Sequence, residues 1–118
     1  MLTFPPSVKV FLASQPMDMR RGFDGLMTVV RNHWRQDVFS GHLFVFVGRR
    51  RDLVKILVWN RGGFVLISKR LERGRFQMPS VGASATTVSL DTTQLAMLLD
   101  GIDFSAVRRP KHWEPPAK

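Results

Sequence analysis

The sequence predicts a small single domain of the α+β class, in which an antiparallel β-meander of about three to five strands packs on two α-helices. The length of 118 residues suits one domain, and 44% of the residues are hydrophobic, which is enough for one core. An early segment carries apolar residues at helical spacing, and three strand-like runs separated by short polar turns fill the middle of the chain.

The chain is expected to begin with a short strand over Val8–Ala13, followed by a helix over Met19–Arg35 with Asp18 as its N-cap. The helix is predicted from five apolar residues at i, i+3, i+4, i+7 and i+11, namely Phe23, Leu26, Met27, Val30 and Trp34. Gly22 and Gly25 each cost about 1 kcal/mol relative to alanine in a helix. This favours close packing on a neighbouring strand over an anion site at the helix start.

Three strands are predicted next, over Leu43–Val47, Leu53–Trp59 and Phe64–Leu71, joined by the turns "GRRRD" and "NRGG". We expect Trp59 to pair with Phe64 and Val47 to pair with Leu53. Alternation then gives one apolar face, made of Phe44, Phe46, Val54, Ile56, Val58, Val65 and Ile67. The other face is mixed, basic toward one end and aromatic toward the other, and holds Leu43, Val45, Val47, Lys55, Leu57, Trp59, Phe64, Leu66, Ser68 and Arg70.

A short strand near Thr87–Leu90 and a second helix complete the expected domain. Asp91 with Gln94 resembles a capping box, Leu90 with Leu95 forms a hydrophobic staple, and Gly101 suits the end of the helix. We therefore expect one α+β domain over residues 1–104. Residues 105–118 form a basic, proline-rich tail that is expected to be mobile.

Composition restricts the class of protein and its partners. The net charge is +9 and the pI is near 11.5, values typical of nucleic-acid-binding proteins but shared by partners of acidic proteins. No cysteine is present, which excludes disulfides and thiolate metal sites. The first residues form a poor signal peptide and no stretch is long enough for a membrane helix, so a cytoplasmic protein without membrane contact is expected.

The positive charge is concentrated in the middle of the chain. From Arg20 to Arg75 the chain has thirteen basic and four acidic residues, which accounts for the whole net charge. Arginine suits bidentate phosphate contacts. The candidate nucleic-acid-binding residues are Arg20, Arg21, Arg31, Arg35, Arg49, Arg50, Arg51, Lys55, Arg70, Arg73 and Arg75. Trp59 and Phe64 are candidates for stacking on an unpaired base or for contacting a protein partner.

No catalytic constellation is recognisable. Most acidic residues have positions that suit caps or turns, and His33 with Asp37 is a single i, i+4 pair without a third metal ligand. His42 and His112 are isolated, so no Ser–His–acid set can be proposed, and phosphate-binding glycine motifs are absent. We therefore expect a non-enzyme with no cofactor and no bound metal.

Three segments together resemble the Orf2-like (TnpB-type) accessory proteins of the insertion sequence 66 family of bacterial transposons. They are "QPMDMRRGFDGL", "DVFSGHLFVFVGRRRDLVKILVWNRGGFVLISKRLERGRFQMP" and "TTQLAMLLDGIDF", in the family's order and spacing. The resemblance implies a small protein encoded beside a separate transposase and needed for efficient transposition, with no catalytic residues to carry over. "VWNRGG" departs from the commoner "WWDGTG"-like turn, so no special role is assigned to that turn.

Two hypotheses about function follow. In the first, the chain is a transposition accessory protein that binds DNA, such as the transposon ends, through an arginine-rich hairpin face. In the second, it is an interaction module for the transposase or another element-encoded protein and does not bind DNA directly. The mixed sheet face around Leu43, Val45, Leu57, Trp59 and Leu66 would then be the protein interface.

Overall fold

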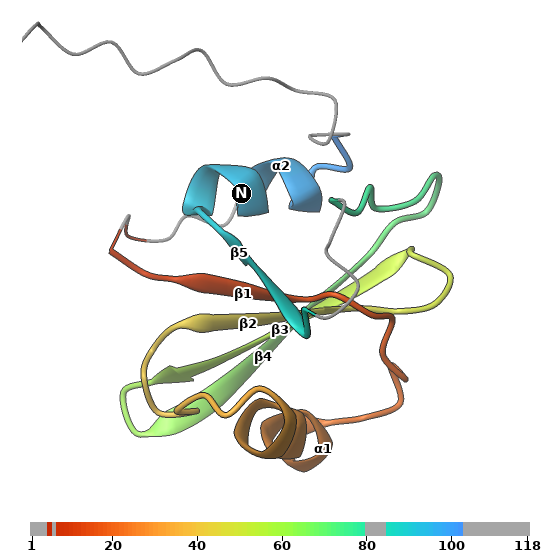
Figure 1. The fold of residues 1–118 in the computed structure, drawn as a ribbon. Coiled ribbons are helices and arrows are strands. Elements are labelled where there is room, and N and C mark those ends of the chain that lie inside the picture. Colours follow the sequence, from red (N-terminus) through yellow and green to blue (C-terminus); the bar gives the residue numbers. More distant parts are fainter. Residues whose placement is uncertain (1–4, 6, 80–84, 103–118) are drawn as a thin grey trace, which may run out of the picture.

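The computed structural model describes residue 5 and residues 7–79 and 85–102, and these build a five-stranded sheet with helices on both faces (Figure 1). The strands lie in the order β4-β3-β2-β1-β5. Their bounds are β1 Val10–Ala13, β2 Leu43–Val47, β3 Leu53–Asn60, β4 Gly63–Arg70 and β5 Thr87–Leu90. The predicted tail over 105–118 lies outside the described residues, so the division of the chain at residue 104 stays a prediction.

The sheet is mixed, whereas a purely antiparallel meander was expected. β2, β3 and β4 do form an antiparallel meander, but β1 pairs with β2 in parallel and with β5 antiparallel. Parallel neighbours need a crossover of a dozen or more residues. The connection from Ser14 to His42, which contains the first helix, provides this crossover.

The first helix is shorter than predicted and changes type along its length. It consists of α1, Phe23–Thr28, and a π-helical segment, η1, Val29–His33. Asp18 is not its N-cap, because the helix starts after Gly22, which makes no side-chain capping bond. The expected close packing of Gly22 and Gly25 on a strand is also wrong: a Cβ on Gly22 would meet open space, and one on Gly25 would meet only the side chain of Arg21.

The β3–β4 hairpin has the predicted register, with Trp59 opposite Phe64 and Leu53 opposite Arg70. The β2–β3 register differs from the prediction by one residue, because Val47 lies opposite Val54 instead of Leu53. Gly48 continues the pairing by donating its N–H to the carbonyl of Leu53 at 3.0 Å, which leaves a four-residue connection. A one-residue change moves every side chain of a strand to the other face.

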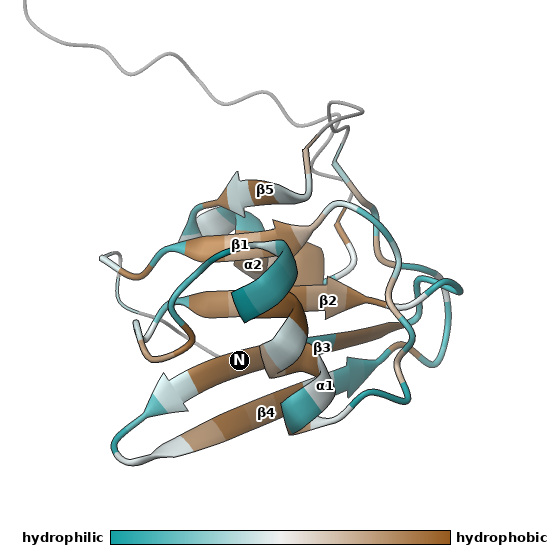
Figure 2. Cartoon of the chain, turned by 60° about the horizontal axis from the view of Figure 1, so that its bottom comes forward, coloured by the Kyte–Doolittle hydropathy of each residue, from teal (hydrophilic) through white to brown (hydrophobic). Residues whose placement is uncertain are grey.

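This shift places the two faces of β2 differently from the prediction. Leu43, Val45 and Val47 join Val54 and Ile56 in a buried cluster that also contains residues of α2. Phe44 and Phe46 join Leu57 and residues of the first helix in a second buried cluster. All eight residues just named are at most 2% exposed. The sheet therefore has an apolar core on both faces, and its hydrophobic strands run through the centre of the molecule (Figure 2).

The second helix, α2 Thr92–Leu99, begins and ends as the sequence predicts. The Asp91 carboxylate accepts from the Gln94 N–H at 2.8 Å, and the Gln94 side chain accepts from the Asp91 N–H at 3.0 Å, which completes the capping box. At the other end Gly101 has φ +74°, and Ile102 donates to the carbonyl of Met97, which completes a Schellman ending. Within the described residues, no helix has the length and apolar character needed to cross a bilayer.

Candidate nucleic-acid interface

Strand direction brings three separate segments of the chain to one end of the sheet. β2 ends, β3 begins and β4 ends there, because β3 is antiparallel to both neighbours. β1 is parallel to β2 and therefore also ends there. The loop after β1, the β2–β3 turn and the segment after β4 meet at this end, on the right of Figure 1. We call residues 14–22, 48–52 and 70–79 the arginine end.

Backbone contacts hold the three segments of the arginine end together. Met17 forms a parallel bridge with Gly48, donating its N–H to the Val47 carbonyl at 3.0 Å. A Cβ on Gly48 would lie 2.6 Å from the Cγ of Met19, so the loop packs closely on the turn. On the other side, Leu71 donates to the Asp52 carbonyl at 2.7 Å, and the Phe76 N–H donates to the Arg51 carbonyl.

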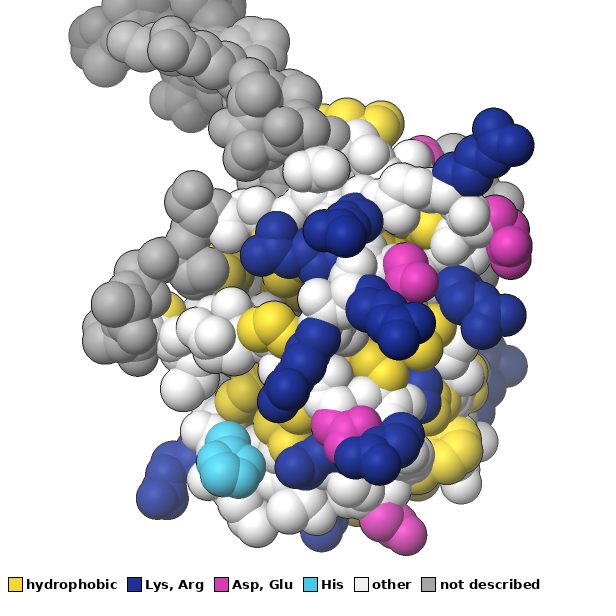
Figure 3. Space-filling view, turned by 90° about the vertical axis from the view of Figure 1, so that its right-hand side faces the viewer, with side chains coloured by type: hydrophobic (Ala, Val, Ile, Leu, Met, Phe, Trp, Pro, Cys, Tyr) yellow, Lys and Arg dark blue, Asp and Glu magenta, His cyan; other side chains and the backbone are white. Residues whose placement is uncertain are grey.

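The arginine end carries a large excess of positive charge. It has three acidic residues, Asp18, Asp52 and Glu72, against eight arginines: Arg20, Arg21, Arg49, Arg50, Arg51, Arg70, Arg73 and Arg75. Lysine and arginine side chains spread over this end of the molecule and outnumber the acidic side chains that lie among them (Figure 3). All eight arginines are exposed. Among the described residues, the one ion pair joins Arg20 to Asp18.

A hollow of about 490 Å³ lies between the loop and the hairpins of the arginine end. Four of the predicted binding residues line it, together with two carboxylates and the backbone of the turn. The lining residues are Met17, Asp18, Met19, Arg20, Gly48, Arg49, Arg50, Asp52, Leu53 and Arg70. Residues as far apart in the sequence as Met17 and Arg70 therefore line one concave, basic surface.

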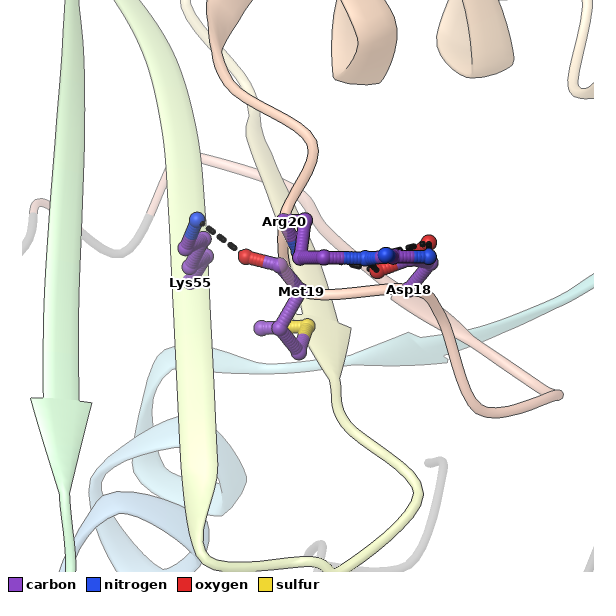
Figure 4. A network of polar contacts seen from close by, with 4 residues as sticks. All are labelled: Asp18, Met19, Arg20 and Lys55. Carbon is purple, nitrogen blue, oxygen red and sulfur yellow. Dashed lines mark hydrogen bonds and ion pairs between the residues drawn. The ribbon is translucent and has the colours of Figure 1, made fainter.

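In the loop in front of the first helix, the side chains of Asp18 and Arg20 bond each other at the edge of this hollow (Figure 4). Arg20 donates to the Asp18 carboxylate from Nε at 3.0 Å and from its terminal nitrogen at 2.8 Å. These hydrogen bonds hold the pKa of the Asp18 carboxyl well below its usual range and raise the pKa of Arg20. The charge of Arg20 is therefore largely balanced by Asp18, although its side chain is 91% exposed.

Lys55 reaches this loop from β3 and has two protein acceptors. Its Nζ donates to the carbonyl of Met19 at 2.7 Å and to the carbonyl of Arg21 at 3.0 Å. The side chain is half-buried. This candidate binding residue therefore fixes the position of the loop that carries Arg20 and Arg21 (Figure 4).

The β2–β3 turn directs its three arginines to two sides. Arg51 has φ +59°, a left-handed conformation that costs a non-glycine residue about 1–2 kcal/mol. Arg49 and Arg50 line the large hollow, whereas Arg51 lines a smaller depression beside Ser14 and Pro16. The turn therefore presents cations over a broad surface instead of one point.

Four of the predicted site residues lie away from the arginine end. Trp59 and Phe64 lie at the far end of β3 and β4, roughly 20 Å away given a rise of about 3.3 Å per residue. Arg31 lies in η1, and its guanidinium is 5.6 Å from the ring centre of Phe39. Arg35 follows η1 with φ +53°. One continuous surface does not join all the candidates.

The far end carries an aromatic cluster whose third member the sequence analysis did not identify. The ring centre of Phe39 is 5.0 Å from that of Trp59 and 5.5 Å from that of Phe64. Phe39 is 49% exposed. Phe39 has no role assigned from the sequence, although a large aromatic residue within the polar segment "DVFSGH" was the signal that could have identified it. Asp52, which lines the basic hollow, was assigned only to a turn.

Within the described part of the chain, no group of three His, Asp or Glu side chains is placed to hold a metal ion. The same residues contain no buried side-chain polar atom without a hydrogen-bond partner. The distinctive chemistry of the described surface is thus that of exposed guanidinium groups.

Comparison with known proteins decides the family. The family described as "IS66 Orf2 like protein" matches residues 8–109, which include every strand and helix described above. The chain belongs to this family. Membership supports a role as an accessory protein in transposition, and the family is not a known catalytic one.

Two proteins from Sinorhizobium fredii are similar to this IS66 Orf2-like chain. The protein y4hO is 40% identical over 117 residues, which cover 98% of this chain and 96% of y4hO. The protein y4jC is 33% identical over 102 residues, which cover 86% of each chain. No solved structure matches the chain.

Proposed function

We propose that this protein assists insertion-sequence transposition by binding DNA through the arginine end, with guanidinium groups contacting backbone phosphates. The observation that carries the proposal is the gathering of eight exposed arginines against three acids, with a single ion pair among the described residues. Arginine forms bidentate bonds with phosphate oxygens. Phosphate contacts give affinity and orientation but no direct sequence readout.

The shape of the arginine end also supports phosphate binding. Arg49 and Arg50 from the β2–β3 turn and Arg70 from the end of β4 converge on one hollow, so a backbone phosphate there would meet several donors at once. Arg51, Arg73 and Arg75 extend the positive surface across the segment that is bonded to the turn. Lys55 contributes by holding the loop that forms the opposite wall of the hollow.

Salt dependence tests the proposal directly. Each phosphate contact on duplex DNA contributes about −0.9 to the slope of log K against log[salt]. Changing Arg49, Arg50 and Arg51 to alanine together is expected to weaken binding and to flatten the slope by up to about three units. Binding to element-end DNA, random duplex and single strands should be measured by fluorescence anisotropy at several salt concentrations.

Arg61→Ala is the matched control, because Arg61 is also an exposed arginine in a hairpin turn but lies at the opposite end of the sheet. It is expected to leave the slope unchanged. A triple variant with the native slope would remove the β2–β3 turn from the interface. If the slope change in the triple variant were only about three times the change in Arg61→Ala, total charge, and not the arginine end, would set the affinity.

The second candidate function is an interaction module for the transposase without direct DNA binding. The sheet face that the sequence suggested as the protein interface is not available to a partner, because Leu43, Val45 and Leu57 are buried under the chain's own helices. The aromatic cluster of the exposed Phe39 and the partly buried Trp59 and Phe64 favours it instead. Co-elution with transposase that is lost in Phe39→Ser, together with salt-insensitive or absent DNA binding, would support this alternative.

A further inference from the structure

β4 is an edge strand whose outer side has no partner among the described residues. It is the last strand in the order β4-β3-β2-β1-β5 and pairs with β3 along its full eight residues. No described residue donates a hydrogen bond to, or accepts one from, the outward backbone groups of Gly63–Arg70. In Figure 2, β4 likewise forms the outer border of the sheet.

The hairpin geometry identifies which backbone groups point outward. Leu71 donates its N–H inward to Asp52, and the two-residue turn places Asn60 opposite Gly63. Because hydrogen-bonded and non-hydrogen-bonded pairs alternate in an antiparallel ladder, residues 63, 65, 67 and 69 face β3. The N–H and C=O groups of Phe64, Leu66, Ser68 and Arg70 therefore face away from the sheet.

This edge lacks the features that usually prevent pairing between molecules. Natural edge strands are protected by proline, bulges, short length or outward charge. β4 has no proline and no bulge, and its register with β3 is unbroken over eight pairs. The ammonium group of Lys69 is turned to the α2 side, where it donates to the carbonyl of Leu99. From Gly63 to Ser68 the strand has no charged residue.

We propose that β4 pairs with β4 of a second copy in antiparallel orientation, with Ile67 opposite Ile67 at the twofold axis. In this register the outward groups of all four residues find partners, since Phe64 lies opposite Arg70 and Leu66 lies opposite Ser68. Residues on the same face meet, as a twofold axis perpendicular to the sheet requires. The half-exposed Val65 and Ile67 of both copies form one apolar strip beside α2.

The distribution of charge along β4 favours a second copy in this register as the occupant. Each Arg70 lies opposite Phe64 of the other copy, and each Lys69 lies opposite Val65, so no like charges face each other. The two Arg70 residues are separated by roughly 20 Å. Antiparallel pairing also directs the two arginine ends to opposite ends of a ten-stranded sheet, which keeps two chains of net charge +9 from opposing their most basic surfaces.

Disulfide trapping tests the pairing and its register. The chain has no cysteine, so a single introduced thiol can form only an intermolecular bond. Ile67→Cys places two thiols at a non-hydrogen-bonded pair with Cα atoms about 4.5 Å apart, within disulfide reach. In the matched control, Val65→Cys, the two Cα atoms lie about 13 Å apart. Rapid oxidation of Ile67→Cys to a dimer is expected, with at least about tenfold slower cross-linking of Val65→Cys.

Sedimentation of the full chain without DNA provides a second test. A concentration-dependent dimer is expected. Ser68→Pro removes an outward N–H from each copy without removing a β3–β4 bond, and should raise the dimer Kd at least about tenfold, whereas Ser68→Thr keeps the N–H and should not. A chain that stays monomeric to millimolar concentration overturns the proposal, as does equal cross-linking of the two cysteine variants. A dimer insensitive to Ser68→Pro also overturns it.

Discussion

Replacing Lys55 with methionine is expected to lower the free energy of unfolding by about 2–3 kcal/mol. The Lys55 ammonium donates to the Met19 carbonyl at 2.7 Å and to the Arg21 carbonyl at 3.0 Å. A hydrogen bond with one charged partner contributes about 1.5–3 kcal/mol, and the solvent-exposed bond to Arg21 contributes less. Methionine retains most of the apolar stem, so the loss reports mainly on these two bonds.

Urea denaturation followed by tryptophan fluorescence measures this loss. With a urea m-value of about 1–3 kcal/mol/M, the unfolding midpoint should fall by about 0.7–3 M. An unchanged midpoint would mean that water serves the two carbonyls equally well. Lys55→Arg is the control, because it keeps the positive charge but changes the group that bonds the carbonyls of Met19 and Arg21.

The same variant separates two roles for Lys55 in the proposed DNA binding. If the lysine acts by positioning the loop, Lys55→Met weakens DNA binding, but the slope of log K against log[salt] stays the same as in the native protein. A direct phosphate contact would instead reduce the slope by about 0.9. The hydrogen bonds from Lys55 to the two carbonyls favour the first result. A slope reduced by about 0.9 would therefore refute the positioning role.

Two further predictions concern local structure. Arg61 has φ +45° and Gly62 has φ +85°, which is the conformation of a type I′ turn. Because asparagine adopts this left-handed conformation more readily than arginine or alanine, Arg61→Asn should stabilise the protein by about 0.5–1 kcal/mol, whereas Arg61→Ala should not. Urea denaturation measures the difference. Because Arg20 holds the Asp18 pKa below the usual value of about 4, the stabilisation from Asp18 is fully present above about pH 5 and is lost as the pH falls through the lowered pKa. The difference in thermal stability between the native protein and Asp18→Asn should therefore shrink on acidification from pH 7 to pH 2, and a difference that grows would contradict the assignment.

Local signals in the sequence determined the elements whose geometry depends on neighbouring residues. The two-residue turn between Asn60 and Gly63 fixes the β3–β4 register, and this register was predicted correctly. The capping box of Asp91 and the glycine ending at Gly101 likewise act within one turn of the helix. The family resemblance and the concentration of charge between Arg20 and Arg75 were also evident from the sequence.

Contacts between distant segments decided the rest. The four-residue β2–β3 connection, with Arg51 in a left-handed conformation, allowed one more ladder pair than expected and reversed the faces of β2. The parallel pairing of β1 with β2 then brought Arg20 to the side of Arg49, and the bond from Phe76 to Arg51 added the segment of Arg73 and Arg75. The sequence alone supplied the cations and the turns. Which cations share a surface was decided by packing on both faces of the sheet, because the energy of burying each face depends on partners far away in the chain.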